Sequence, residues 1–218
     1  MNSDFSLKGS KILVTAGSTW IAIDSVRIIT NIFKGKIGLT IAQIASQLGA
    51  DVTLFLGPSL DVSTIELPPT LSIKRFKYFD ELDELVRITL KGQKFDAIIH
   101  SAAVSDFMMD KQVIGKIKSD VQNLSLNLIP TRKIIDEIRH LAPKAYLVKF
   151  KLEVGISVDN LIDIAFASLN KSNADLIVAN IYDPQFHDHE AYIIDKDRNV
   201  KNIKGKIDIA TEILRHVI

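Results

Sequence analysis

Runs of apolar residues alternate with amphipathic segments along most of the chain. Short continuous apolar runs are typical of strands that are buried on both faces of a sheet. They occur at residues 11–15, 51–56, 72–76, 96–101, 146–150 and 175–179. Apolar positions at helical spacing, which predict amphipathic helices, occur at residues 36–48, 79–90, 132–140, 158–169 and 207–216. This order of elements predicts an α/β fold.

The alternation of strands and helices favours a Rossmann-like, doubly wound and mainly parallel sheet. Residues 191–195 and 199–203 flank a turn at residues 196–198, and this pattern predicts a hairpin at the C-terminal edge of the sheet. Neither an internal repeat nor a linker divides the 218 residues. We therefore expect a single domain over residues 1–218.

Composition narrows the classes of function. The longest apolar run, at residues 96–104, is too short to span a bilayer. The 27 Lys and Arg residues balance 26 Asp and Glu residues, which gives no electrostatic reason to expect a nucleic-acid partner. The chain has no cysteine, and residues 1–9 lack the apolar core of a signal peptide. These features favour a cytoplasmic protein without a membrane span.

Ligands of such sheets bind beyond the carboxyl ends of the strands, so the loops at these ends are candidate sites. After the first strand, Gly17, Ser18 and Thr19 form a turn whose N–H groups and hydroxyls suit contact with a phosphate. Small-residue turns also close strands in many folds without binding a ligand. For this segment alone, both interpretations stay open.

A second candidate site lies before the first predicted helix. Arg27 and Lys36 bring positive charge to a helix N-terminus, where anions are stabilised, and Gly35 and Gly38 permit close backbone approach. Solvated surface charge is the alternative interpretation. Asn31 has an amide that both donates and accepts hydrogen bonds, which suits holding a reacting carboxyl group.

A third candidate site follows the strand at residues 96–101. Ala102 and Ala103 leave room for a flat ligand, and the Asp106 carboxylate is able to accept hydrogen bonds from a ribose or a base. Lys116 follows in a predicted loop that would close over phosphates. A helix-capping aspartate and a solvated lysine are the alternative interpretations.

A nicotinamide-dependent reductase of the short-chain type is the main alternative enzyme. Its dinucleotide fingerprint needs glycines directly after the first strand, whereas Gly35 and Gly38 lie about twenty residues beyond Thr15. The end of the second strand offers no acidic residue for a ribose. The Tyr-x-x-x-Lys spacing of Tyr192 and Lys196 falls in a predicted strand and turn, where these residues would stand roughly 13 Å apart.

One run of residues resembles a metal cluster. Residues 187–190 read His-Asp-His-Glu, but alternate residues in a loop without a distant partner specify a metal site poorly. We interpret this run as a surface loop and assign no residue to a metal.

Several motifs occur in an order that resembles phosphopantothenoylcysteine synthetase, the coenzyme A biosynthetic ligase. They are residues 12–19 (ILVTAGST), 23–31 (IDSVRIITN), 35–38 (GKIG), 101–107 (SAAVSDF), 116–119 (KIKS), 150–153 (FKLE) and 175–180 (DLIVAN). The resemblance covers nearly the whole chain. We expect the separate, monofunctional form, because residues 1–10 leave no room for a preceding flavin-binding decarboxylase domain.

The resemblance implies amide formation between 4′-phosphopantothenate and L-cysteine, driven by CTP or ATP through an acyl-nucleotide intermediate with release of pyrophosphate. It also implies Mg²⁺ and a homodimer with active sites shared across the interface. Cationic groups and N–H donors would stabilise the charge on the triphosphate. A nucleotide-binding module without turnover is the remaining alternative.

The resemblance further implies roles for individual residues. Asn31 would hold the substrate carboxyl and the acyl intermediate, and Lys116 would be the flap lysine that assists the chemistry. The implied substrate-binding residues are Arg27, Asn31, Lys36 and Ala103. The implied nucleotide-binding residues are Gly17, Ser18, Thr19, His100, Ser101, Ala102, Asp106, Lys116, Phe150 and Lys171. Ser18, Trp20 and Lys34 depart from the family pattern, which leaves the phosphate geometry open.

Overall fold

The centre of the molecule is an eight-stranded sheet in the order β12-β11-β10-β9-β6-β1-β4-β5. The computed structural model describes residues 5–63, 66–120, 122–185 and 189–217. Six neighbouring strands of the sheet are parallel: β1 (Lys11–Ala16), β4 (Asp51–Leu56), β5 (Leu71–Arg75), β6 (Ala97–His100), β9 (Tyr146–Glu153) and β10 (Leu176–Ile181). Their spatial order is that of the Rossmann fold, with the direction of winding reversing between β1 and β6. The predicted α/β, mainly parallel sheet is confirmed.

An antiparallel hairpin forms one edge of the sheet. It consists of β11 (Glu190–Asp195) and β12 (Val200–Lys204), and β11 pairs with β10. The Asp195 carboxylate organises the turn, because its Oδ1 accepts the backbone N–H groups of Asp197 at 3.0 Å and Asn199 at 2.8 Å. The predicted C-terminal edge hairpin is therefore confirmed.

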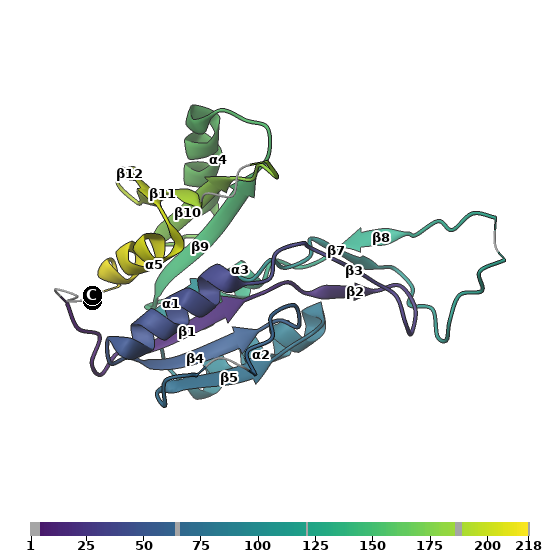
Figure 1. Ribbon diagram of the computed structural model, residues 1–218, viewed down its shortest axis with the longest axis horizontal. Helices are drawn as coiled ribbons and strands as arrows, with labels where there is room; N and C mark the ends of the chain where they lie inside the picture. Colours follow the sequence, from purple (N-terminus) through teal and green to yellow (C-terminus); the bar gives the residue numbers. More distant parts are fainter. Residues whose placement is uncertain (1–4, 64–65, 121, 186–188, 218) are drawn as a thin grey trace.

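Helices cover both faces of the sheet (Figure 1). One face carries α1 (Lys36–Gln47) and α5 (Lys206–Arg215), and the other carries α2 (Phe79–Gly92), α3 (Ile134–Leu141) and α4 (Val158–Lys171). Along β1, Ile12 and Val14 pack on the first face and Leu13 packs on the second, as the alternation of side chains along a strand requires. Each of the predicted helices is present. Within the described ranges, no helix has the length and apolar character needed to cross a membrane.

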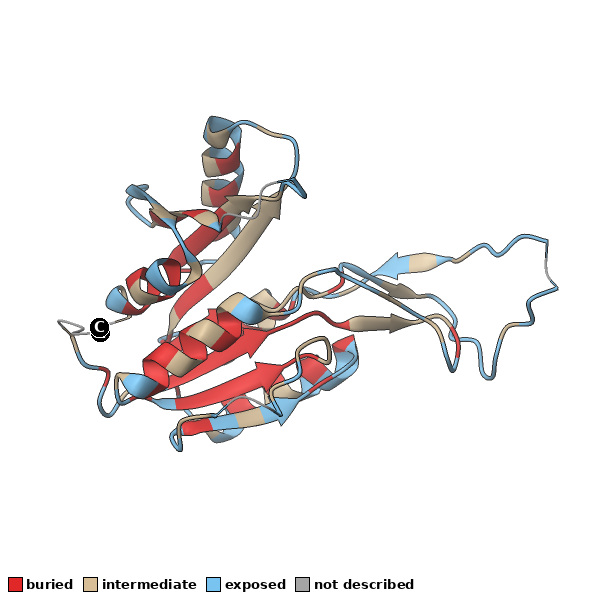
Figure 2. Cartoon of the chain, in the orientation of Figure 1, coloured by how far each residue is buried: buried red, intermediate tan, exposed pale blue. Residues whose placement is uncertain are grey.

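Residues 17–35 and 102–131 form an arm that the hydrophobic pattern did not predict. Its two ribbons project from the carboxyl edge of the sheet (Figure 1). Strand β2 (Trp20–Ala22) pairs antiparallel with β3 (Ile28–Thr30), and β7 (Phe107–Met109) pairs antiparallel with β8 (Leu128–Pro130). Figure 2 shows that most of the arm is exposed or only partly buried. Strands of three residues are too short for a periodic pattern to reveal them.

Candidate functional site

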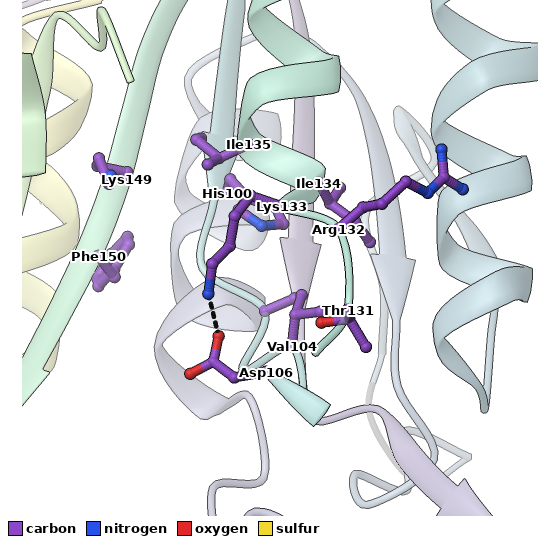
Figure 3. A pocket seen from close by; sticks show the side chains of 11 residues that line it. His100, Val104, Asp106, Thr131, Arg132, Lys133, Ile134, Ile135, Lys149 and Phe150 are labelled. Carbon is purple, nitrogen blue, oxygen red and sulfur yellow. Dashed lines mark hydrogen bonds and ion pairs between the residues drawn. The ribbon is translucent and has the colours of Figure 1, made fainter. Parts of the chain in front are cut away.

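A pocket lies at the carboxyl end of β6 and beside the middle of β9, close to the point where the winding of the sheet reverses. Doubly wound sheets bind their ligands at this position. The cavity measures about 150 Å³, whereas cavities that hold a whole small molecule measure about 300–1,000 Å³. It is lined by His100, Ala102, Val104, Asp106, Thr131, Arg132, Lys133, Ile134, Ile135, Lys149 and Phe150 (Figure 3). The pocket therefore has room for only part of a nucleotide.

A row of polar side chains crosses the sheet beneath the pocket. Thr15 on β1 is the register partner of His100 on β6, which is in turn the partner of Lys149 on β9. Partners in register on parallel strands lie on the same face, so the three side chains are neighbours. Thr15 Oγ1 and His100 Nδ1 are hydrogen-bonded at 2.8 Å, and the Ala102 N–H donates to Thr15 Oγ1 at 3.3 Å. The strand pairing therefore fixes the position of the imidazole.

The Lys149 ammonium is held by hydrogen bonds to two serines at the C-terminal end of α4. Its Nζ donates to the Ser168 carbonyl at 3.0 Å, to Ser168 Oγ at 2.9 Å and to Ser172 Oγ at 3.0 Å. Burial lowers the pKa of Lys149. Burial of His100, together with the charge of Lys149, lowers the pKa of the imidazole to about 4. At neutral pH the pocket thus contains an uncharged imidazole beside a fixed lysine.

An ion pair spans the mouth of the pocket. Lys133 Nζ lies 2.5 Å from Asp106 Oδ1, and both side chains are more than half exposed (Figure 3). The Arg132 side chain is directed away from this pair, and its Nη2 lies 2.8 Å from Asp83 Oδ2 on α2. A ligand hydroxyl that donates to Asp106 would compete with Lys133. Asp106 is thus accessible to a ligand, while Arg132 is held by α2.

The turn after β1 is held together by its own hydroxyl groups. Gly17 adopts a φ of +85°, a conformation that favours glycine. Ser18 Oγ donates to the Phe33 carbonyl at 2.6 Å, and Thr19 Oγ1 donates to Ser105 Oγ at 3.1 Å and accepts the Ser105 N–H at 2.8 Å. Ser18 and Thr19 are both buried. Their side chains therefore stabilise the loop, and the Thr19 N–H is engaged as well, because it donates to the Ala103 carbonyl at 3.3 Å.

Two glycines let α1 lie directly against the loops at the sheet edge. Gly35 precedes α1 with a φ of +85°, and a Cβ atom added there would lie 2.3 Å from the Gly17 nitrogen. A Cβ atom added at Gly38 would lie 2.4 Å from Ser101 Oγ and 2.5 Å from Ala16 Cβ. We expected these glycines to let a ligand approach the backbone closely. Instead, the space beside them is filled by the residues of the chain itself.

Two of the predicted substrate-binding residues are in contact at the base of the arm. Asn31 Nδ2 donates to the Ala103 carbonyl at 3.1 Å. Lys36 is exposed at the first position of α1. Arg27 lies farther along the arm, where its guanidinium forms an ion pair with Asp24. The structure brings Asn31 and Ala103 together and leaves Arg27 apart from the pocket lining.

Two predicted lysines lie outside the pocket lining. Lys116 is an exposed residue of the arm and borders a separate open hollow. Lys171 is the exposed last residue of α4. Instead, Lys133 and Lys149 line the pocket, and the sequence analysis missed both. Lys149 could have been recognised from the sequence, because a charged residue inside a buried strand is uncommon. Lys133 could not have been recognised, because its partner Asp106 is distant in the sequence.

The described residues provide no cluster of three or more His, Cys, Asp or Glu side chains that would hold a metal ion. His187 and Asp188, from the run at residues 187–190, lie outside the described residues. Glu190 begins β11, and its Oε1 accepts a hydrogen bond of 2.7 Å from Asn202 Nδ2.

Comparison with known proteins identifies the family of the chain. The family model described as the DNA/pantothenate metabolism flavoprotein C-terminal domain matches residues 7–218. The chain belongs to this family. A relative, the coenzyme A biosynthesis bifunctional protein CoaBC of Thermococcus kodakarensis, is 42% identical over 175 residues, which are 80% of this chain and 42% of the relative. The chain spans about half the length of the curated relatives it matches.

Solved structures of the same family share the fold. The DNA/pantothenate metabolism flavoprotein from Streptococcus pneumoniae is 32% identical and has a TM-score of 0.86 over 96% of this chain and 98% of that chain. The C-terminal domain of a CoaBC protein is 26% identical, with a TM-score of 0.75 over 96% of this chain and 94% of that chain.

Membership in the flavoprotein C-terminal domain family argues against the reductase alternative, as does the position of the Tyr-x-x-x-Lys pair. Tyr192 lies on β11. Lys196 lies in the following turn, where its Nζ is 2.5 Å from Asp175 Oδ1. The pair is therefore part of the edge hairpin rather than of a helix that would make the two residues neighbours.

Proposed function

We propose that the chain is a phosphopantothenate–cysteine ligase of coenzyme A biosynthesis. The observation that carries this proposal is the family match over residues 7–218, together with the 42% identity to a coenzyme A biosynthesis protein. The pocket beside β6, next to the winding reversal, supports it, because ligands of doubly wound sheets bind in this region and the ligase needs a nucleotide site. We expect one catalytic domain located in the cytoplasm.

In the proposed reaction, the carboxylate of 4′-phosphopantothenate attacks the α-phosphorus of CTP or ATP, and pyrophosphate leaves. The acyl-nucleotide that results has a good leaving group. The amine of L-cysteine attacks its carbonyl carbon, the nucleoside monophosphate leaves, and an amide bond forms. The protein would contribute positioning and charge stabilisation to both steps.

The nucleotide would occupy the pocket at the end of β6 and beside β9. His100, Ala102, Asp106 and Phe150 were each predicted to contact it, and all four line this pocket. Asp106 would accept hydrogen bonds from the ribose after displacing the ammonium of Lys133. Gly17, Ser18, Thr19, Ser101 and Lys171 stay further predicted contacts of the nucleotide. The N–H groups of Thr19 and Ser101 donate to the Ala103 and Thr15 carbonyls, so these two residues would contact the nucleotide without their backbone donors.

The substrate carboxyl would lie at the base of the arm. Asn31 and Ala103 are in contact there, so the Asn31 amide is oriented before the substrate binds. The second N–H of the Asn31 amide would donate to the substrate carboxylate and then to the acyl intermediate. Arg27 and Lys36 would bind the phosphate of 4′-phosphopantothenate.

We further propose a homodimer in which the arm of one subunit completes the site of the other. Lys116 lies on the arm and not in the lining of its own pocket, which is too small for all the substrates. Of the fourteen exposed large hydrophobic side chains among the described residues, eight lie on the arm. They are Val26, Ile28, Ile32, Phe107, Val113, Ile114, Leu124 and Ile129. Apolar surface of this kind is typical of an interface.

We propose that Mg²⁺ binds together with the nucleotide. Mg²⁺ prefers oxygen ligands, keeps several waters and is commonly bound through substrate phosphates. The described residues offer no cluster of ligating side chains, which fits a cation carried by the triphosphate rather than held in a protein cage.

The reaction is tested by pyrophosphate release. Purified protein with Mg²⁺ and each nucleotide in turn should release pyrophosphate when 4′-phosphopantothenate is present and should not release it when that substrate is omitted. Addition of L-cysteine should yield the amide product. Absence of pyrophosphate with both nucleotides would refute the ligase, and nucleotide binding without turnover would indicate a binding module.

The shared site is tested by mixing two inactive variants. Asn31→Ala and Lys116→Ala should each have little activity alone. If Asn31 and Lys116 of one site come from different subunits, random exchange restores about a quarter of the intact sites. The control is Asn127→Ala, which alters another amide of the arm that bonds Asp110 at 3.2 Å, and it should retain activity. No recovery in a mixture shown to contain heterodimers would contradict a shared site.

A further inference from the structure

The turn between β2 and β3 contains a carboxylate that is buried although the arm has little core. The Asp24 side chain is 0% exposed, whereas the neighbouring residues Ser25 and Val26 are exposed. Removing a charge from water is costly unless hydrogen bonds and an opposite charge compensate it. Groups around Asp24 must therefore compensate its buried charge.

The two carboxylate oxygens of Asp24 bind different partners. Oδ1 accepts the N–H groups of Val26 at 2.9 Å and Arg27 at 2.8 Å, which closes the turn locally. Oδ2 accepts the N–H of Ile117 at 3.0 Å and also binds Arg27 Nη1. Burial by itself raises the pKa of Asp24, but the N–H donors of Val26, Ile117 and Arg27, with the Arg27 side chain, lower it to about 2. Asp24 is thus charged at neutral pH.

Further hydrogen bonds join the same two segments. The Ser25 N–H donates to the Gly115 carbonyl at 3.0 Å, and the Gly115 N–H donates to Ser25 Oγ at 3.1 Å. Arg27 Nη1 donates to the Ile117 carbonyl at 3.2 Å. We call Asp24, Ser25 and Arg27, with Gly115 and Ile117, the latch. It joins the two ribbons of the arm across some ninety residues of sequence.

The hydrogen bonds of the latch lie on both sides of Lys116 in the sequence. Its two chain neighbours are both hydrogen-bonded to the opposite ribbon, while Lys116 itself is exposed and borders the open hollow with Lys118. Gly115 adopts a φ of +88°, which turns the chain immediately before the lysine. A lysine on a free loop would lose rotamer and backbone freedom on meeting a phosphate, and a lysine with a fixed backbone loses less.

We propose that Asp24 is a positioning residue for Lys116, which it serves by fixing the backbone on both sides of that lysine through the latch. The inference rests on the proposed function, in which Lys116 assists nucleotidyl transfer. The latch also engages Arg27, so that one guanidinium both completes the latch and lies where the phosphate of the substrate is expected. In the proposed homodimer Lys116 serves the site of the partner subunit, so the latch would connect Arg27 of one site to Lys116 of the other.

The variant Asp24→Asn tests the latch selectively. An asparagine keeps Oδ1 and with it the local turn, but replaces Oδ2 by an NH₂ group that faces the donors of Ile117 and Arg27. The matched control is Asp195→Asn, because Asp195 also accepts backbone N–H groups in a turn, in the edge hairpin away from the arm. Both variants should have near wild-type midpoints of thermal unfolding.

The first readout is tryptic cleavage after Lys116 in the native protein, followed by fragment mass. Asp24→Asn should raise the rate of this cleavage at least several-fold, and Asp195→Asn should leave it unchanged. This measurement does not depend on ligase activity. Unchanged cleavage in Asp24→Asn would contradict the latch, even if the wild-type protein proves to have no ligase activity. Absence of activity from the wild type would instead refute the proposed function.

The second readout is a double-mutant cycle on pyrophosphate release. If Asp24 acts through Lys116, Asp24→Asn lowers kcat about tenfold or more with little change in the nucleotide KM, and it adds almost nothing in a Lys116→Ala background. A purely structural role predicts the same loss of kcat in both backgrounds. Equal losses in the two backgrounds, or wild-type kcat in Asp24→Asn, would overturn the proposal.

Discussion

The central sheet and the arm differ in what stabilises them. In the sheet, β1 and β4 bury all but their first residues, and apolar side chains from both faces pack against helices. In the arm, the paired strands have few buried positions, and specific hydrogen bonds such as those of Asp24 join the ribbons. An apolar core tolerates exchanges between apolar side chains of similar volume, whereas a hydrogen bond is lost when either partner is removed. We therefore expect substitutions in the sheet to affect stability and substitutions in the arm to affect activity.

The largest expected effect is on the stability of the sheet. Phe55 on β4 is fully buried, and Phe55→Ala should lower the free energy of unfolding by about 3–5 kcal/mol, because it removes apolar contacts and leaves a cavity. Urea unfolding measures this change. The control is Gln112→Ala on the arm, where the side chain is exposed and polar and the effect should stay within about 0.5 kcal/mol. Similar losses in the two variants would remove the distinction between sheet and arm.

The next largest effect is on catalysis by the arm. Lys116→Ala should lower turnover about 10²–10³-fold, the usual cost of removing a group that stabilises transition-state charge, while the free energy of unfolding stays unchanged. Steady-state pyrophosphate release gives the first quantity and urea unfolding the second. Lys111→Ala removes another exposed lysine from the same arm and should be close to wild type. A loss of stability in Lys116→Ala would mean that the arm depends on this residue structurally.

A smaller effect distinguishes two lysines near the nucleotide. Lys149 lines the pocket, whereas Lys171 is exposed outside its lining. Lys149→Met should weaken nucleotide binding about tenfold, because a partly buried positive charge near an anionic ligand is removed. Lys171→Met should change binding less. Calorimetric titration with CTP or ATP compares the two variants, and the opposite order would favour the role that the family resemblance implies for Lys171.

A separate expected effect, which grows only as the pH falls, is a dependence of stability on pH. The folded state keeps His100 neutral down to about pH 4, whereas an unfolded histidine binds a proton below about pH 6.5. Stability from this group is therefore complete above pH 6.5 and is lost as the pH falls from 6.5 to 4. Urea unfolding at several pH values should show a steeper decline for wild type than for His100→Gln. The exposed His140→Gln variant should retain the wild-type slope.

The strands and helices of the body were predictable because each is long enough for a periodic pattern. The strand at residues 11–15 and the helix at residues 36–48 agree with β1 and α1 to within one residue at each end. The edge hairpin was predictable for the same reason, since two alternating segments flank a turn. The single-domain boundary at residues 1–218 and the assigned roles of the site residues stay predictions.

The candidate site was predictable only in part. The loops after β1 and β6 follow from the α/β topology, so His100 and Asp106 were found. Lys133 was not found, because its contact with Asp106 depends on how the arm returns to the sheet before α3. The burial of Asp24 was equally hidden, since the local sequence indicates only a turn.

By itself, the sequence determined the α/β class, the edge hairpin and the order of motifs that identifies the family. These are properties of local periodicity and of residue order, which a linear chain displays directly. Only the tertiary structure decided that Thr15, His100 and Lys149 form one row, that Lys116 lies outside its own pocket, and that the latch joins the two ribbons. Such contacts join residues far apart in the chain, and their existence depends on strand register and on the path of the arm.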